Sequence, residues 1–152
     1  MVRRIVNRTL LKEPVLDVEV ANLRERGMLG IAIAKQNNAT NQKTTKTFVF
    51  LYYIEAKQDG SDAKNGDPPL GNRLYRYELM DGNLKNGKLL LDIPAERSAL
   101  HNGGKILIGP DSNVYLVVGD LAHRTRLQNY EKKFNPQRNK RSISPYTGWQ
   151  TC

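Results

Sequence analysis

Short runs of alternating or continuous apolar residues, separated by turn residues, fill the first 120 positions of the chain. Many of these runs are rich in β-branched and aromatic side chains, which suit a pleated sheet. No window of about 11 residues keeps the i, i+3, i+4 apolar spacing of a helix, apart from an ambiguous piece at Val20–Leu29. The pattern therefore predicts an all-β protein, with strands at Arg4–Asn7, Pro14–Val20, Gly27–Ala34, Thr47–Ile54, Asn72–Met80, Lys88–Ile93, Lys105–Ile108 and Val114–Val118.

Turn residues between these runs predict two hairpins and two longer connections. Asp81-Gly82-Asn83 supplies the turn of the first hairpin, and Gly109–Asn113 supplies the turn of the second and clearer one. The polar stretches Gln36–Lys46 and Ala56–Gly71 are expected to be exposed connections. Seven or eight short strands fit a sandwich, a barrel or part of a propeller, and periodicity alone does not choose among them.

The positive charge is concentrated near the C-terminus. Seven of the 24 basic residues, but only Glu131 of the 15 acidic ones, lie after Asp120, so this segment holds +6 of the net charge of +9. It also has few aliphatic residues and scattered prolines, which leaves little apolar surface to offset the entropy of ordering it. We therefore divide the chain into a β domain at 1–120 and a basic, mostly irregular tail at 121–152. A basic arm for polyanions is the lesser alternative, and a nucleic-acid partner is not expected.

Composition excludes several classes of protein and site. No apolar run approaches the roughly 18 residues of a membrane-spanning helix. The single cysteine, Cys152, allows no disulfide within the chain and no cysteine zinc cluster. Histidine occurs only as His101 and His123, so a His-rich metal site is excluded and a histidine base must be one of these two.

His101 is the better placed of the two histidines, because it opens the turn His101-Asn102-Gly103-Gly104 ahead of a strand. Asp120 follows the partner strand of the same predicted hairpin. Since the open ends of antiparallel strands meet, the two side chains are expected to come within hydrogen-bond reach. A carboxylate there would fix the imidazole tautomer and increase its basicity. The alternatives are an exposed turn histidine and an aspartate that closes a turn.

Several segments in order carry a resemblance to a known family: Glu25–Ala32, Thr47–Tyr53, Asn72–Leu79, Leu100–Asp111 and Val114–Asp120. Over about residues 3–130 the chain resembles the glucose/sorbosone dehydrogenase family. The resemblance implies a six-bladed β-propeller that uses pyrroloquinoline quinone (PQQ) and calcium to oxidise aldose sugars to lactones, with an external electron acceptor. It also implies roles for three residues. His101 is similar to the family's catalytic base, Asp120 to the catalytic-site carboxylate that orients it, and Glu25 to a polar side chain beside the quinone.

The chain also departs from the family pattern. About eight strands make only two blades of four and a fragment, so we expect a partial six-bladed propeller with an irregular tail. The family's calcium loop and its later quinone contacts are not found in this sequence. We therefore expect a truncated form that is inactive on its own. A non-enzymatic partial propeller that acts as a binding module is the alternative.

Location is the last expectation drawn from the sequence. The family is extracytoplasmic, either secreted or periplasmic, but Met1–Leu11 is followed by Lys12, Glu13 and Pro14 and lacks the apolar stretch of a signal peptide. We therefore expect an extracytoplasmic ancestor and a present chain that stays inside the cell.

Overall fold

The structure is a computed structural model that describes residues 1–38, 41–57, 68–95 and 99–121. Within these residues all regular structure is β, which confirms the predicted class, and the ambiguous piece Val20–Leu29 contains no helix. The strands are β1 Ile5–Val6, β2 Thr9–Leu10, β3 Met28–Asn38, β4 Asn41–Glu55, β5 Gly71–Met80, β6 Asn83–Ile93, β7 Lys105–Ile108 and β8 Val114–Val117.

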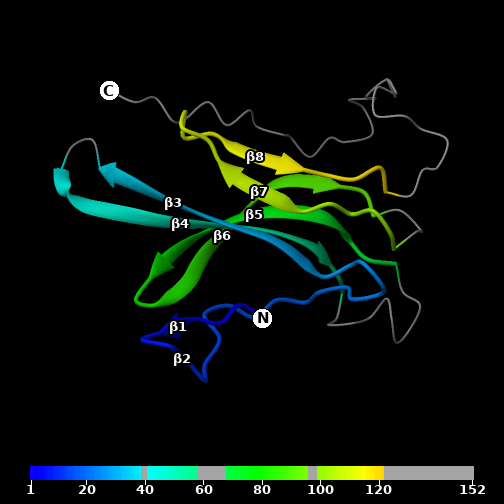
Figure 1. Ribbon diagram of the computed structural model, residues 1–152, viewed down its shortest axis with the longest axis horizontal. Helices are drawn as coiled ribbons and strands as arrows, with labels where there is room; N and C mark the ends of the chain where they lie inside the picture. The colour runs from blue at the N-terminus through cyan, green and yellow to red at the C-terminus, as the bar shows by residue number, and fades with distance from the viewer. Residues whose placement is uncertain (39–40, 58–67, 96–98, 122–152) are drawn as a thin grey trace.

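The strands form one four-stranded antiparallel sheet and two small hairpins. The sheet has the order β3-β4-β5-β6, so each strand pairs with its neighbour in the sequence, and β1-β2 and β7-β8 form separate two-stranded sheets. The β3–β4 hairpin extends past the neighbouring strands (Figure 1). A four-stranded meander is the unit from which propeller blades are built. The arrangement is therefore compatible with a partial propeller.

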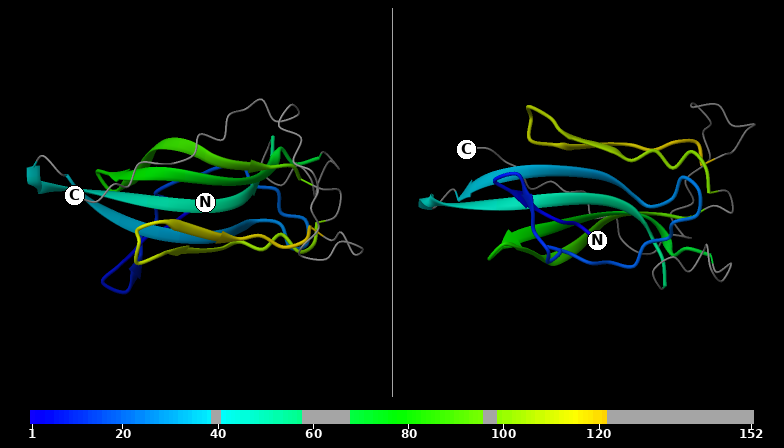
Figure 2. Two further views of the ribbon diagram at one scale, coloured as in Figure 1. Left: turned by 90° about the horizontal axis from the view of Figure 1, so that it is seen from above. Right: turned by 60° about the horizontal axis from the view of Figure 1, so that its bottom comes forward.

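The core lies on both faces of β4, because the run Phe48–Ile54 is apolar at every position and central in the sheet. On one face, Val49, Leu51 and Tyr53 pack with Tyr77 and with side chains of the N-terminal segment. On the other face, a second cluster receives the β7–β8 hairpin; its buried members are Phe48, Phe50, Tyr52, Leu74 and Ile106. Figure 1 shows the two small hairpins on opposite sides of the sheet, and Figure 2 gives two further views of the same arrangement. The β7–β8 hairpin is thus fixed against the sheet by apolar packing.

Several boundaries differ from the sequence prediction. The stretch Gln36–Lys46, expected as a loop, is mostly the end of β3 and the start of β4, because cross-strand pairing in a long hairpin overrides its polar composition. Pro14–Val20 is not a strand and makes only isolated bridges through Leu16 and Val20. β6 begins at Asn83, well before Lys88, and the predicted Arg4–Asn7 strand is reduced to Ile5–Val6.

The second connection was expected to be exposed between Ala56 and Gly71. Ala56 is buried, and Gly71 is buried as the first residue of β5, so both ends of this segment belong to the packed sheet. Residues 58–67 lie outside the described part of the chain. The tail proposed at 121–152 likewise lies outside it after Leu121, so the division at Asp120 stays a prediction. Among the residues that the structure describes, there is no helix with the length and the hydropathy of a membrane span.

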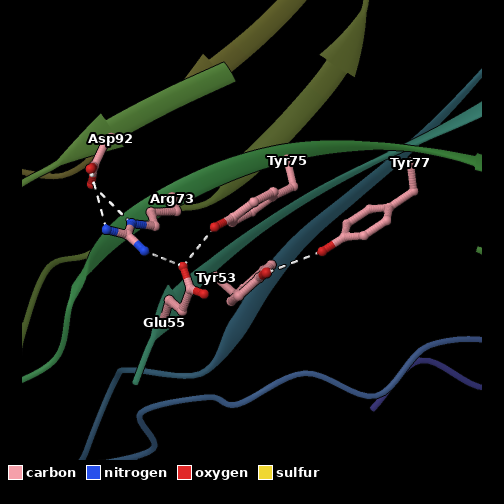
Figure 3. Close-up of polar contacts among 6 residues, drawn as sticks. All are labelled: Tyr53, Glu55, Arg73, Tyr75, Tyr77 and Asp92. Atoms are coloured by element: carbon pink, nitrogen blue, oxygen red, sulfur yellow. Dashed lines mark hydrogen bonds and ion pairs between the residues drawn. The ribbon is translucent and has the colours of Figure 1, made fainter. Parts of the chain in front are cut away.

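A polar network joins three strands on the face that packs against the N-terminal segment (Figure 3). The Arg73 guanidinium donates from Nε to Asp92 Oδ1 over 3.1 Å and from Nη1 to Glu55 Oε2. The Tyr75 hydroxyl donates to the same Glu55 oxygen over 2.7 Å, and its ring stacks on Tyr53 with centroids 5.3 Å apart. Burial lowers the pKa of Arg73, but its two carboxylate partners outweigh that effect and raise it overall. The network fastens β4, β5 and β6 to one another.

Replacing Arg73 with alanine is expected to lower the free energy of unfolding by about 3 kcal/mol, because Glu55 and Asp92 lose their shared cation while still partly buried. The Arg73 side chain is only 13% exposed. The matched control is Lys85→Ala, which removes the exposed i, i+4 pair with Asp81 and should cost about 0.5 kcal/mol or less. Urea denaturation followed by circular dichroism measures both. Equal losses in the two variants would contradict the prediction.

Stability is expected to fall between pH 10 and 12. Burial raises the pKa of Tyr52 from 10.0 to about 12, and burial followed by the hydrogen bond to Glu55 does the same for Tyr75. Below pH 10 the folded and unfolded states both keep these protons, so the contribution to stability is fully present. Above pH 10 the unfolded chain loses protons that the folded chain keeps. The free energy of unfolding should therefore fall by up to about 1.4 kcal/mol per pH unit for each such tyrosine.

Denaturant unfolding at pH 8, 10 and 11 measures this decline, and absorbance of tyrosinate near 295 nm follows the ionisation itself. Tyr52→Phe should make the decline shallower, because it removes one of the groups. Ionisation of all tyrosines near pH 10 in the folded protein would show the explanation to be wrong.

Candidate active site

His101 lies in the loop just ahead of β7, with a left-handed backbone at φ 58°. Its N–H donates to Glu25 Oε2 over 2.6 Å. Its carbonyl oxygen accepts from the N–H of Leu121 over 3.3 Å. The backbone of His101 is therefore held by Glu25, which lies far from it in the sequence, and by Leu121, which follows the partner strand of the hairpin.

The imidazole of His101 faces Asp120, with 2.7 Å between Nδ1 and Oδ1. The pairing Lys105↔Val117 aligns the open ends of β7 and β8, so the residues flanking the two strands meet as the hairpin argument predicted. His101 is 51% exposed and Asp120 is 41% exposed. The ring is thus open to a ligand while one of its nitrogens is engaged by the protein.

Glu25, the third residue singled out from the sequence, lies in the loop that precedes β3. Its N–H donates to the carbonyl oxygen of Ala99 over 3.2 Å, which places it beside the loop of His101. The structure therefore brings Glu25, His101 and Asp120 together.

Two glycine contacts explain why these loops can approach so closely. A Cβ at Gly119 would overlap the carbonyl oxygen of His101. A Cβ at Gly30 would overlap the carbonyl oxygen of Gly104, at the contact of β3 with the loop that leads into β7. Both positions require glycine because the atoms in the way are backbone atoms, which cannot rotate aside.

Tyr52 and Asn102 belong to the surroundings of the site and were not singled out from the sequence. The buried Tyr52 hydroxyl donates to the carbonyl oxygen of Asn102 over 3.3 Å, directly beside His101. The Asn102 side chain is also buried. A buried tyrosine needs a hydrogen-bond partner for its hydroxyl, so its place in an apolar strand was the sequence signal for such a contact. Which residue supplies the partner could be known only from the fold.

The geometry gives the histidine a defined chemical capacity. A carboxylate accepts hydrogen bonds, so Asp120 favours the tautomer with the proton on Nδ1 and leaves the lone pair on Nε2. A half-exposed imidazole in this state can take a proton from a bound hydroxyl group. This is the arrangement of a general base and its orienting carboxylate.

Comparison with known proteins then identifies the family. The family model described as glucose/sorbosone dehydrogenase matches residues 1–135. The chain belongs to the glucose/sorbosone dehydrogenase family. A search of curated proteins finds no match. Membership in the glucose/sorbosone dehydrogenase family makes this a sugar dehydrogenase-like chain, as the resemblance of its motifs predicted.

The polar groups gathered here can bind a hydroxylated molecule. A half-exposed imidazole lies near two carboxylates, those of Asp120 and Glu25, which accept hydrogen bonds from hydroxyl groups. Within 1–38, 41–57, 68–95 and 99–121, no three side chains of His, Cys, Asp or Glu gather into a metal-binding group. No calcium ligand is therefore assigned to the described residues.

Proposed function

We propose that this chain contributes the proton-abstracting part of a PQQ-dependent aldose dehydrogenase. The observation that supports the proposal most directly is the 2.7 Å pair between His101 Nδ1 and Asp120 Oδ1 on a half-exposed histidine. The family membership supplies the substrate class. PQQ, when bound, would accept the hydride that leaves the anomeric carbon of the sugar.

In the same step, residues of this chain would accept the proton and stabilise the positive charge that results. His101 Nε2 takes the proton of the anomeric hydroxyl as the C–H bond breaks, so the aldose becomes a lactone by losing one proton and one hydride. Asp120 stabilises the imidazolium that forms, since its carboxylate is hydrogen-bonded to Nδ1. We further propose that Glu25 lies beside the quinone, and that calcium and an external electron acceptor complete the reaction.

The test is an assay for reduction of an artificial electron acceptor by an aldose in the presence of PQQ and calcium. It uses the 152-residue chain and, in parallel, a chimera in which residues 1–120 replace the matching segment of an active family member. We expect quinone-dependent activity from the chimera and none from the chain alone. A folded chimera that binds PQQ but shows no aldose-dependent turnover would refute the assignment.

The alternative is a non-enzymatic binding module. The outer face of the β7–β8 hairpin exposes Leu107, Tyr115 and Val117, which are apolar side chains of the kind found at contact surfaces. This alternative predicts that the chain retains a saccharide or protein ligand without PQQ. It also predicts that replacing His101 leaves that binding unchanged.

We propose an extracytoplasmic site of action for the reaction, as the family membership suggests. Fractionation of cells of the source organism tests this. Recovery of the protein only inside the cytoplasmic membrane would contradict it.

A further inference from the structure

The contact between Glu25 and His101 is made to the backbone of the histidine. Glu25 Oε2 lies 2.6 Å from the His101 nitrogen, a distance typical of a strong hydrogen bond to a charged acceptor. The same contact spans 76 positions of the sequence. This contact is made within the protein itself, so it is a role separate from any contact with a quinone.

The backbone of His101 needs such support because its φ of 58° lies in the left-handed region. Non-glycine residues are uncommon in this region, and although histidine enters it more readily than most, such residues persist there where surrounding contacts hold them. The backbone conformation also sets the direction in which the imidazole side chain leaves the main chain. Loss of it would move the ring away from Asp120.

Glu25 is itself fixed by the loop that it supports. Its N–H donates to Ala99 O over 3.2 Å, while the N–H of His101 donates back to its carboxylate. Glu25 also lies within a tight turn, in which the Arg26 N–H donates to Leu23 O over 3.1 Å. The two hydrogen bonds between Glu25 and Ala99–His101 therefore form a reciprocal link between the two loops.

We infer that Glu25 is a positioning residue that holds the backbone of His101 in its left-handed conformation and so aims the imidazole at the substrate. The inference rests on the proposed function for its kinetic consequence, but the contact itself exists without cofactor or sugar. It predicts that the acceptor oxygen matters more than the negative charge. Glutamine, which keeps an acceptor oxygen of similar reach, should therefore replace glutamate with little loss.

The first experiment measures the contact in the 152-residue chain without ligands. Nuclear magnetic resonance of the His101 amide should show a downfield proton that exchanges slowly with solvent, because it is hydrogen-bonded to a carboxylate. Glu25→Ala should make its exchange at least about 10-fold faster. Glu25→Gln should keep most of the protection, and Glu13→Ala, at an exposed glutamate elsewhere in the N-terminal segment, should change nothing.

The second experiment measures catalysis in the PQQ-loaded chimera with the same three variants. Glu25→Ala should lower kcat by about 10- to 100-fold, the range expected when a catalytic group is displaced by a fraction of an ångström to an ångström. Because Glu25 is also proposed to lie beside the quinone, kcat is measured at saturating PQQ, and the KM for the aldose should change much less. Glu25→Gln should recover most of kcat.

Three results would overturn the inference. One is unchanged amide exchange in Glu25→Ala, which would mean that the contact does not hold the backbone. Another is a loss of PQQ affinity with normal kcat at saturating PQQ, which would make Glu25 a cofactor contact alone. The third is a Glu25→Gln variant as defective as Glu25→Ala in both experiments. Failure of the proposed function would appear differently, as a protected His101 amide in a protein that does not oxidise aldoses.

Discussion

Replacing His101 with alanine is expected to lower kcat/KM for an aldose by about 10²- to 10⁴-fold in the PQQ-loaded chimera. The imidazole is held by Asp120 on one side and presents Nε2 on the other, and alanine offers no atom that can accept the proton of the anomeric hydroxyl. Hydride loss without removal of that proton would leave a protonated lactone. The variant should still bind PQQ, since the lost atoms are those of the base.

The control is Glu13→Ala, at the exposed glutamate of the N-terminal segment that also serves as the control for Glu25. It should leave kcat/KM within about 2-fold of the parent, as expected for a position outside the proposed site. Asp120→Asn should give an intermediate loss, since the carboxamide still contacts Nδ1 but no longer stabilises the imidazolium. Full activity of His101→Ala would remove the histidine from the mechanism.

Replacing Gly30 with alanine is expected to destabilise the fold by about 3 kcal/mol or more. The new Cβ would overlap the carbonyl oxygen of Gly104 and lie 3.0 Å from Ile106 Cγ1. Backbone atoms lie on both sides of this contact, so neither β3 nor the loop before β7 can yield without moving a whole segment. The β7–β8 hairpin should therefore separate from the sheet.

Thermal or urea unfolding measures the loss, and the matched control is Lys35→Ala on the same strand. The Lys35 side chain is exposed, so that substitution should change the free energy of unfolding by no more than about 0.5 kcal/mol. In Gly30→Ala the His101 amide should also exchange faster, because the loop it belongs to is displaced. A stable variant with an unchanged amide would show that the close approach of Gly30 and Gly104 is not required.

The strands were predictable where side-chain pattern and burial agree. The run Phe48–Ile54 is apolar and aromatic throughout, and it forms the buried C-terminal half of β4. The pattern failed at Gln36–Lys46, where polar side chains belong to a hairpin held by its backbone hydrogen bonds. It also failed at Pro14–Val20, whose alternation reflects packing of an irregular segment against the sheet.

The candidate site was partly predictable for the same kind of reason. His101 and Asp120 flank two adjacent strands, so local pairing alone brings them together. Glu25 came from the family resemblance, and its backbone contact with His101 depends on the packing of β3 against β7, which periodicity does not encode. The contact of Tyr52 with Asn102 is of the same long-range type.

The reciprocal link between Glu25 and the His101 loop has a consequence for the order of events in folding. The β7–β8 hairpin is local and can form early, whereas the contact of Glu25 with His101 joins residues 76 positions apart. Long-range contacts of this kind form late, because a large loop must close before they contribute. The histidine should therefore reach its left-handed conformation only after the sheet and the hairpin have docked. A protein that has begun to unfold would lose the geometry of the His101–Asp120 pair before it loses its strands.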